Sequence, residues 1–395
     1  MNLPSVKILY TSAYAQMVGG GQESLLQLLK RLDRSKFTPL VVCPGKGEFS
    51  TKVAALNAET RILPFPKLKH TKVWRPASTI IKLRRLILKE KIGIVHCDTL
   101  YTTVYAGLAC LGTRVPAIFH ARTAESGGFL DRIAFILSKN IICVSRAVAG
   151  RFATFCGYEK KTRVIYNGVD TDEFKSDSFR ELAKKRYHIP PANKVIGYCG
   201  QLIEGKGVGT LVQAFKRVRE ELPDTILILA GRGEAEGLLK KMVKTSGMEF
   251  SVIFTGHQNN ISEIIGILDI FVLPTFYKEG LSRSIIEAMA MAKPVITTLL
   301  GGNPEAVVEG VTGLLVPPGD VSALSKAITS FLKESARAKE MGKAGRKRVE
   351  ELFRIEENVC KTENIYSCLC EGVIASEQSE RSNLRLPRRK VRSSQ

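Results

Sequence analysis

Lys206 lies between two glycines in the segment GQLIEGKG, residues 200–207, which joins a predicted strand to a predicted helix. A glycine-rich turn presents backbone N–H groups, the start of a helix favours anions, and the lysine adds a positive charge. The segment has the Walker A spacing up to Lys206, but Gly207 stands where that motif needs Ser or Thr for magnesium, and no plausible Walker B acid follows. We therefore reject a P-loop ATPase and predict a phosphate group beside Lys206. The structural alternative is an ordinary turn with a solvated lysine.

The segment KEGLSRSIIEAMA, residues 278–290, carries two carboxylates, Glu279 and Glu287. We predict a helix over 281–292, with Glu279 at or just before its first residue. Eight positions along a helix correspond to two turns plus ~80°, so the two side chains would share a side only loosely and reach different depths. Each also has a structural explanation, because Glu279 can complement the helix dipole and Glu287 can be a buried, paired carboxylate. Together with the turn around Lys206, they form a candidate site.

Other glycines and one histidine mark turns that we expect near a ligand. Gly231 follows an apolar strand, but the third glycine of a dinucleotide fingerprint comes one residue late, at Gly237. An NAD-dependent dehydrogenase is therefore weakly supported, although glycine still permits close approach of the backbone to a ligand. The glycines at 19–21 precede the first predicted helix, and His120 ends a predicted strand. Taken alone, His120 is more readily explained as a core histidine.

Short apolar strands alternate with amphipathic helices along most of the chain, and this alternation must position these residues. The first half predicts strands over 6–10, 39–43, 92–97, 117–120 and 140–144, and helices over 24–32, 76–90 and 102–111. The second half predicts strands over 195–199, 225–230, 252–254, 270–273 and 294–297, and helices over 208–222, 234–246, 281–292 and 321–334. Such alternation is typical of a parallel sheet covered on both faces. We therefore predict an α/β fold with two consecutive α/β domains.

The domain boundaries follow from changes in composition. A polar stretch that ends near the prolines at 190–191 separates the two halves. We predict an N-terminal domain over 1–175, a second domain over 176–352, and a helix over 353–375 that packs back toward the N-terminal domain. The last twenty residues, 376–395, hold six basic and two acidic side chains and little to bury, which predicts a disordered basic tail.

The chain of 395 residues has a formal net charge of +21, and this charge is uneven. Residues 1–175 hold 27 Lys and Arg against 12 Asp and Glu. An anionic partner is therefore expected, although a basic surface without a specific partner is the alternative. Binding to nucleic acid is not expected, because aromatic side chains do not alternate with the basic ones and there is one Trp. Nine scattered cysteines without a CxxC pair, and no long apolar run or signal peptide, indicate a reduced cytoplasmic setting.

Taken in order, these segments resemble the retaining nucleotide-sugar glycosyltransferases of family 4, which have the GT-B fold. The resemblance covers about residues 5–352. Its signatures are GGGQES (19–24), His120 after a strand, IICVS (141–145), VIYNGVD (164–170), GQLIEGKG (200–207), AGRGE (230–234), DIFVLPTFYKEGLSRSIIEAMA (269–290) and GGNPEAVVEGVTGLLVPPGD (301–320). The resemblance implies two Rossmann-like, doubly wound parallel-sheet domains that face each other across a cleft, with the donor held by residues 176–352.

The resemblance also implies roles for the candidate residues. Lys206 would neutralise the donor diphosphate, Glu279 would contact the donor sugar near its reacting carbon, and His120 would lie beside that sugar. Glu287 would bind the ribose hydroxyl groups. The implied donor-binding set is Gly19, Gly20, Gly21, Gln201, Lys206, Gly231, Gly280, Leu281, Ser282 and Glu287, and no residue is expected to hold a metal.

The expected reaction transfers a hexose-type sugar, with retention, to a glycan or a lipid-linked acceptor in cell-surface polysaccharide or lipopolysaccharide biosynthesis. The donor is a nucleoside diphosphate sugar, with a UDP-sugar favoured over a GDP-sugar, and neither a metal nor another cofactor is expected. One departure matters, because the family usually has Arg where this chain has Gln201. Arg122 and Arg283 are the neighbours that we expect to compensate. The alternatives are a catalytically impaired binding scaffold and another GT-B enzyme such as an epimerase or phosphorylase.

A second partner is suggested by residues 67–91, which hold nine basic side chains and one acid, with Trp74 beside Pro76. Part of the predicted helix at 76–90 must pack on the sheet, so a solvated basic face is an equally good explanation. Since the excess charge is concentrated in this domain, we expect peripheral binding to the anionic inner face of the cytoplasmic membrane.

Overall fold

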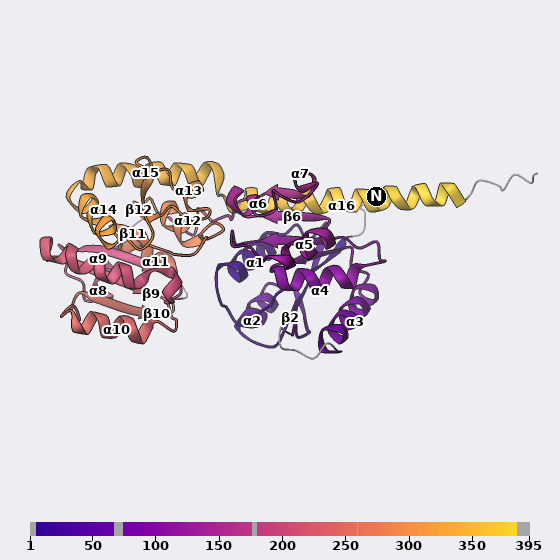
Figure 1. Ribbon diagram of the computed structural model, residues 1–395, viewed down its shortest axis with the longest axis horizontal. Helices are drawn as coiled ribbons and strands as arrows, with labels where there is room; N and C mark the ends of the chain where they lie inside the picture. Colours follow the sequence, from indigo (N-terminus) through magenta and orange to yellow (C-terminus); the bar gives the residue numbers. More distant parts are fainter. Residues whose placement is uncertain (1–4, 67–73, 176–179, 259, 385–395) are drawn as a thin grey trace, which may run out of the picture.

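The structure is a computed structural model, which describes residues 5–66, 74–175, 180–258 and 260–384. It contains two parallel sheets, one in each half of the chain (Figure 1). The N-terminal sheet has the strand order β3-β2-β1-β4-β5-β6-β7. Its strands are β1 (Val6–Thr11), β2 (Phe37–Cys43), β3 (Glu59–Ile62), β4 (Ile94–Cys97), β5 (Ala117–Ala121), β6 (Asn140–Cys143) and β7 (Thr162–Val164).

Helices cover both faces of the N-terminal sheet. Successive residues of a strand point to opposite faces, so apolar strands need a cover on each face. Ile8 and Tyr10 of β1 belong to one buried cluster with α1 and α2, whereas Leu9 belongs to another with α3 and α4. The helices are α1 (Gly20–Arg31), α2 (Glu48–Ala55), α3 (Trp74–Lys89), α4 (Leu100–Cys110), α5 (Phe129–Leu137), α6 (Arg146–Gly150) and α7 (Tyr158–Lys161).

The second sheet has the strand order β10-β9-β8-β11-β12-β13. Its strands are β8 (Lys194–Cys199), β9 (Thr225–Ala230), β10 (Val252–Gly256), β11 (Ile270–Leu273), β12 (Val295–Thr298) and β13 (Gly313–Val316). Its helices are α8 (Arg180–Arg186), the 3-10 turn η1 (Glu204–Lys206), α9 (Val208–Glu221), α10 (Glu236–Thr245), α11 (Ile261–Ile267), α12 (Arg283–Ala290), α13 (Asn303–Ala306), α14 (Val321–Lys333) and α15 (Ser335–Leu352). The prediction of two α/β domains with parallel sheets is therefore confirmed.

Each sheet reverses its strand order at one point. β1 lies between β2 and β4, and β8 lies between β9 and β11. In open α/β sheets a ligand binds at such a switch point, beyond the carboxyl ends of the strands. The loops that follow β1, β8 and β11 are those that carry the glycines at 19–21, Lys206 and Glu279. The topology therefore brings the predicted site residues of both domains to one crevice.

The last helix, α16 (Ile355–Leu384), runs back along the N-terminal domain and continues past it (Figure 1). Ile355, Val359 and Tyr366 belong to the same buried cluster as α1. The predicted disordered tail begins at residue 376, but the backbone is helical up to Leu384, so that boundary was placed too early. The rest of the predicted tail, 385–395, lies outside the described residues. Among the described residues, no helix is both long and apolar enough to span a bilayer.

Candidate active site

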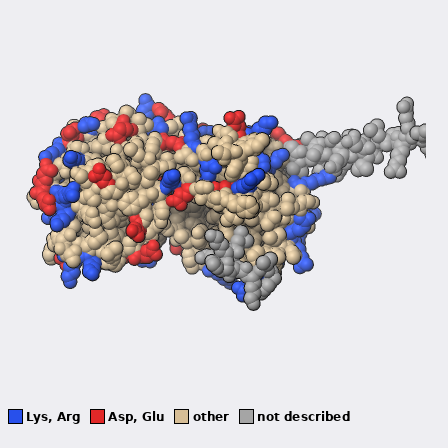
Figure 2. All heavy atoms as spheres, viewed as in Figure 1, with Lys and Arg blue, Asp and Glu red and all other residues tan. Residues whose placement is uncertain are grey.

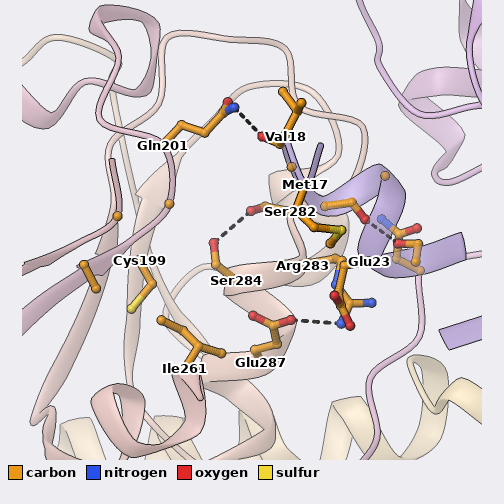
Figure 3. A pocket seen from close by; sticks show the side chains of 18 of the residues that line it. Met17, Val18, Glu23, Cys199, Gln201, Ile261, Ser282, Arg283, Ser284 and Glu287 are labelled. Atoms are coloured by element: carbon orange, nitrogen blue, oxygen red, sulfur yellow. Dashed lines mark hydrogen bonds and ion pairs between the residues drawn. The ribbon is translucent and has the colours of Figure 1, made fainter. Parts of the chain in front are cut away.

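A cavity of about 720 Å³ lies between the two domains. Figure 3 shows its lining, with Met17, Val18 and Glu23 on the N-terminal side and Gln201, Ser282 and Glu287 opposite them. Every predicted donor-binding residue lines this cavity: Gly19, Gly20, Gly21, Gln201, Lys206, Gly231, Gly280, Leu281, Ser282 and Glu287. Glu279 also lines it, whereas His120 lines a neighbouring cavity of about 440 Å³. The structure therefore brings together residues that are up to 268 positions apart, from Gly19 to Glu287.

Lys206 and Glu279 form an ion pair at the floor of this site. Lys206 ends the 3-10 turn η1, and the next residue, Gly207, has a φ of 69°, in the left-handed region that glycine tolerates best. A Cβ atom at Gly207 would lie 1.9 Å from the carbonyl oxygen of Pro274, so the turn also needs a glycine for close packing. The Thr275 hydroxyl group donates to the same carboxylate oxygen, Oε1 of Glu279, at 3.3 Å. The turn thus holds the ammonium group and the carboxylate in contact without substrate.

Glu279 precedes the helix by several residues, because α12 begins at Arg283 with Ser282 as its N-cap. The prediction that the helix starts at Leu281 was therefore wrong by two residues. The helical angle that was expected between the two carboxylates does not apply, since the backbone of Glu279 lies in the loop and its side chain turns toward Lys206. Glu279 and Glu287 consequently lie in one cavity but have different ionic partners.

Glu287 is buried on α12 and pairs with Arg283 one turn earlier, with 3.0 Å between Arg283 Nη2 and Glu287 Oε1. Burial raises the pKa of the Glu287 carboxyl group, and the charge and hydrogen bond of Arg283 oppose that shift. Figure 3 shows both side chains on the cavity wall beside Ser284 and Ser282, whose hydroxyl groups lie 3.2 Å apart. The pair leaves the other carboxylate oxygen of Glu287 available to hydroxyl groups of a ligand.

The start of α12 presents backbone N–H groups to the cavity. Among the described residues, none accepts a hydrogen bond from the N–H groups of Leu281 or Ser282, whereas Gly280 lies in an antiparallel bridge between the segments of Thr123 and Glu279. Free N–H groups at the start of a helix of eight residues, together with the helix dipole, attract an anion. A Cβ atom at Gly280 would lie 2.1 Å from the carbonyl oxygen of Arg122, so only glycine fits this contact between the domains.

Gln201 joins the two domains across the cavity. Its side-chain nitrogen donates to the carbonyl oxygen of Val18 at 2.5 Å (Figure 3). Gly231 has a φ of 144°, and a Cβ atom there would lie 1.8 Å from the carbonyl oxygen of Gly200. The site therefore has a neutral amide where a second cation was expected, and the glycine after β9 is needed for close packing of two loops.

The segment 164–170 also joins the domains. Asn167 Nδ2 donates to the carbonyl oxygen of Leu281 at 2.8 Å, and Arg283 Nη1 donates to the carbonyl oxygen of Gly168 at 3.1 Å. Asp170 accepts from the N–H groups of two following residues and forms an ion pair with Arg31. This signature therefore fixes the position of the helix start that faces the cavity.

His120 lies in a chain of buried polar groups that starts on α16. The Tyr366 hydroxyl group lies 2.6 Å from Nδ1 of His96, and Nε2 of His96 lies 3.0 Å from Nδ1 of His120. Arg122 Nη2 lies 3.2 Å from the same Nδ1. Because a guanidinium can only donate, Nδ1 of His120 accepts and its proton is on Nε2. Nε2 is buried without a partner among the described residues, so it is the ring atom left for a ligand.

Burial keeps both histidines neutral. It lowers the pKa of His96 to about 3 and that of His120 well below its usual range, and the positive charge of Arg122 adds to both shifts. Asp98 lines the same cavity as His120, and burial raises the pKa of its carboxyl group to about 7. The sequence indicated His120 but not His96, Asp98 or Tyr366. The position of Asp98 directly after a predicted strand could have indicated it as a site residue. No local sequence pattern indicates that Tyr366 lies near the site.

Within the described ranges, no three His, Cys, Asp or Glu side chains gather where they could hold a metal ion.

Comparison with known proteins places this geometry in a family. Residues 18–173 match the description Glycosyltransferase Family 4, and residues 179–348 match Glycosyl transferases group 1. The chain is 27% identical over 307 residues to the capsular polysaccharide biosynthesis glycosyltransferase CapM of Staphylococcus aureus, covering 73% of this chain and 80% of that protein. It is 28% identical over 369 residues to a GDP-mannose-dependent phosphatidylinositol monomannoside mannosyltransferase of Mycolicibacterium smegmatis, covering 86% and 92%.

The crystal structure of HepE from Anabaena, in complex with UDP and glucose, has the same fold with a TM-score of 0.81. Its sequence identity is 21%, and the match covers 92% of this chain and 99% of HepE. The two family matches together span the strands from β2 to β13 and the cavity-lining segments that carry the glycines at 19–21, Lys206 and Glu279. The chain belongs to the family 4 glycosyltransferases and has the GT-B fold.

Proposed function

We propose that this glycosyltransferase transfers a hexose-type sugar from a nucleoside diphosphate sugar to a hydroxyl group of a glycan or a lipid-linked acceptor, with retention and without a metal ion. The observation that carries the proposal is the ion pair of Lys206 and Glu279 beside the free N–H groups of the α12 start, inside a cavity that both domains line. This arrangement places positive charge and a carboxylate within reach of one small ligand.

The reaction breaks the bond between the sugar's anomeric carbon and the diphosphate, so negative charge grows on the leaving phosphate oxygen. Lys206 and the N–H groups of Leu281 and Ser282 stabilise this charge, and such preorganised electrostatic stabilisation is usually the largest catalytic contribution. The acceptor oxygen bonds to the same face of the carbon. Its proton passes to the leaving phosphate oxygen, so the products are the glycoside and the nucleoside diphosphate.

The remaining site residues orient the substrates. Glu287 accepts from the ribose hydroxyl groups with the oxygen that Arg283 does not hold. Glu279 contacts the donor sugar, and the ion pair with Lys206 fixes the orientation of the Glu279 carboxylate. Nε2 of His120 donates a hydrogen bond to a sugar hydroxyl group from the N-terminal side. The cavity that His120 lines is the proposed acceptor site, since Tyr14, Tyr101 and Asp98 line it as well.

For the donor, we propose a UDP-sugar over a GDP-sugar. HepE, which shares the fold, was crystallised with UDP-glucose, whereas the mycobacterial relative uses GDP-mannose. For the pathway, we propose cell-surface polysaccharide or lipopolysaccharide assembly, because relatives include a capsular polysaccharide enzyme and a lipopolysaccharide core mannosyltransferase.

We also propose peripheral binding to the anionic inner face of the cytoplasmic membrane. The outer face of α3 exposes Ile81 and Leu88 together with Lys82, Arg85 and Lys89. Helix α4 lies between α3 and α5. Helix α5 exposes Phe129, Arg132 and Ile136, and the exposed Lys139 follows it. Figure 2 shows Lys and Arg side chains along the outer edge of this domain. Apolar side chains among basic ones suit an anionic lipid surface, where each basic residue contributes about 1 kcal/mol. The part of the predicted segment at 67–73 lies outside the described residues.

Thermal stabilisation by a panel of UDP- and GDP-sugars tests the proposed donor. A ligand at 100 times its Kd adds roughly 2.7 kcal/mol to the free energy of unfolding. We expect one nucleoside diphosphate sugar, and its nucleoside diphosphate, to stabilise the protein. If no member of the panel raises the melting temperature, the proposal is wrong.

Gln201 keeps one second candidate open, a catalytically impaired scaffold that binds nucleotide. Release of nucleoside diphosphate during incubation with donor and a sugar acceptor separates this candidate from an active transferase.

A further inference from the structure

The donor site has little net positive charge from the residues of its own domain. Glu279 neutralises Lys206, and the side chain at position 201 is an amide that donates to Val18. A nucleoside diphosphate brings at least two negative charges into this space. Charge-assisted hydrogen bonds are roughly twice as strong as neutral ones, so a second cation would contribute substantially to binding.

Three arginines line the cavity between the domains, and two of them are poor candidates for the second cation. Arg283 is held by Glu287 and by the carbonyl oxygen of Gly168. Arg232 is exposed in the turn after β9 and is therefore strongly solvated. Arg122 differs from both, because its Nε and Nη1 atoms are buried and have no partner among the described residues. Its remaining nitrogen, Nη2, faces Nδ1 of His120.

Arg122 also has the right position. It lines both the cavity between the domains and the neighbouring cavity of His120, so it stands where donor and acceptor meet. A Cβ atom at Gly21 would lie 3.4 Å from Cδ of Arg122, and one at Gly280 would lie 2.1 Å from its carbonyl oxygen. Both glycines belong to the proposed donor cradle. The side chain of Arg122 therefore lies directly against this cradle.

We propose that Arg122, from the N-terminal domain, supplies the second cation for the donor diphosphate that the amide of Gln201 does not supply. This inference rests on the proposed function. The guanidinium presents two donors in a fixed fork that matches a phosphate group, and it stays charged when it is buried. The side chain of Gln201 thus contacts the N-terminal domain, and the second cation for the diphosphate comes from the N-terminal domain.

Isothermal titration with UDP, uridine and pyrophosphate tests this inference, with GDP and guanosine in parallel. We expect Arg122→Gln to bind UDP and pyrophosphate roughly 10- to 100-fold more weakly, as for the loss of a charge-assisted hydrogen bond, and to bind uridine as the wild type does. Arg122→Lys should fall in between, because it keeps the charge and loses the fork. Arg217→Gln, which removes an exposed charge on α9, is the control and should not change any affinity.

The double variant Arg122→Gln/Gln201→Arg sharpens the test. Restoring the arginine at the family's usual position should recover most of the lost UDP affinity, which a merely unfolded or distorted site would not do. Thermal unfolding without ligand checks that each variant is folded. If Arg122→Gln binds UDP with wild-type affinity, the inference is overturned. This holds even if the variant raises the KM for the acceptor, because Arg122 would then act on the acceptor and not on the diphosphate. A wild-type protein that binds neither UDP nor GDP overturns the proposed function as well, so the two failures are distinguishable.

Discussion

Replacing Lys206 with alanine tests the electrostatic account of catalysis. In the part of the chain that the structure describes, the ammonium group of Lys206 is the one side-chain cation paired with Glu279, and both side chains are largely enclosed, with exposed fractions of 18% and 15%. In such a partly dry site, loss of one preorganised charge typically reduces turnover by 10²–10³, or about 2.7–4 kcal/mol. We therefore predict that Lys206→Ala lowers kcat by this factor. The assay is release of nucleoside diphosphate at saturating donor.

The same variant has a structural effect that must be separated from the catalytic one. It leaves the Glu279 carboxylate with the Thr275 hydroxyl group as its remaining side-chain donor, which should cost about 1–3 kcal/mol of unfolding free energy. Adding Glu279→Gln should recover part of this stability, as measured by urea unfolding, without restoring turnover. Near-wild-type turnover of folded Lys206→Ala would refute the reasoning, since catalysis would then not depend on the positive charge of Lys206.

Four further predictions follow from the site and the surface. EDTA should not change turnover, and a loss that magnesium or manganese restores would contradict the metal-free diphosphate site. Tyr366→Phe should lower the unfolding free energy in urea by about 1–3 kcal/mol, because His96 Nδ1 loses its buried donor, whereas Tyr158→Phe should not. Since the pKa of Asp98 is raised to about 7 in the folded state, the native protein holds a proton that the unfolded chain has lost between pH ~4 and ~7. Stability should therefore fall as pH rises through this window, and urea unfolding of Asp98→Asn should lack that slope. The protein should sediment with anionic but not with neutral vesicles, and only at low salt. The triple variant Lys82→Gln/Arg85→Gln/Lys89→Gln should weaken this binding. Equal binding to neutral vesicles would favour the explanation of α3 as a solvated basic face.

Much of the fold was predictable, because strands of parallel sheets are continuous apolar runs. The runs at 225–230 and 270–273 agree with β9 and β11 to the residue. Elements that bury little were missed. Strand β3 is an edge strand with mostly exposed side chains, and α2 buries only Phe49 and Val53, so neither has a strong periodic signal. The last helix was predicted to end too early, because its polar final part has no apolar stripe to mark it.

The site was predictable where one local segment carries several functional groups. The turn at 200–207 and the loop before α12 both line the cavity as expected. Contacts between distant segments could not be predicted, because their partners are set by tertiary packing. Gln201 with Val18, and Tyr366 with His96, are such contacts, as is the enclosure of Arg122 between Gly21 and His120. The pairing of Glu279 with Lys206 depends on where α12 starts. Because the predicted start was two residues too early, the position of the Glu279 side chain relative to Glu287 was predicted wrongly.

The anomeric configuration of the released sugar tests the central claim most directly. The protein is incubated with the α-linked nucleoside diphosphate sugar that stabilises it most, and proton NMR follows the first product, formed with an acceptor or, without one, by slow hydrolysis. We predict release of the nucleoside diphosphate together with an α-configured product before mutarotation. A β-configured first product would contradict the retaining mechanism, and absence of nucleoside diphosphate release with every donor would contradict the assignment of the cavity between the domains as the donor site.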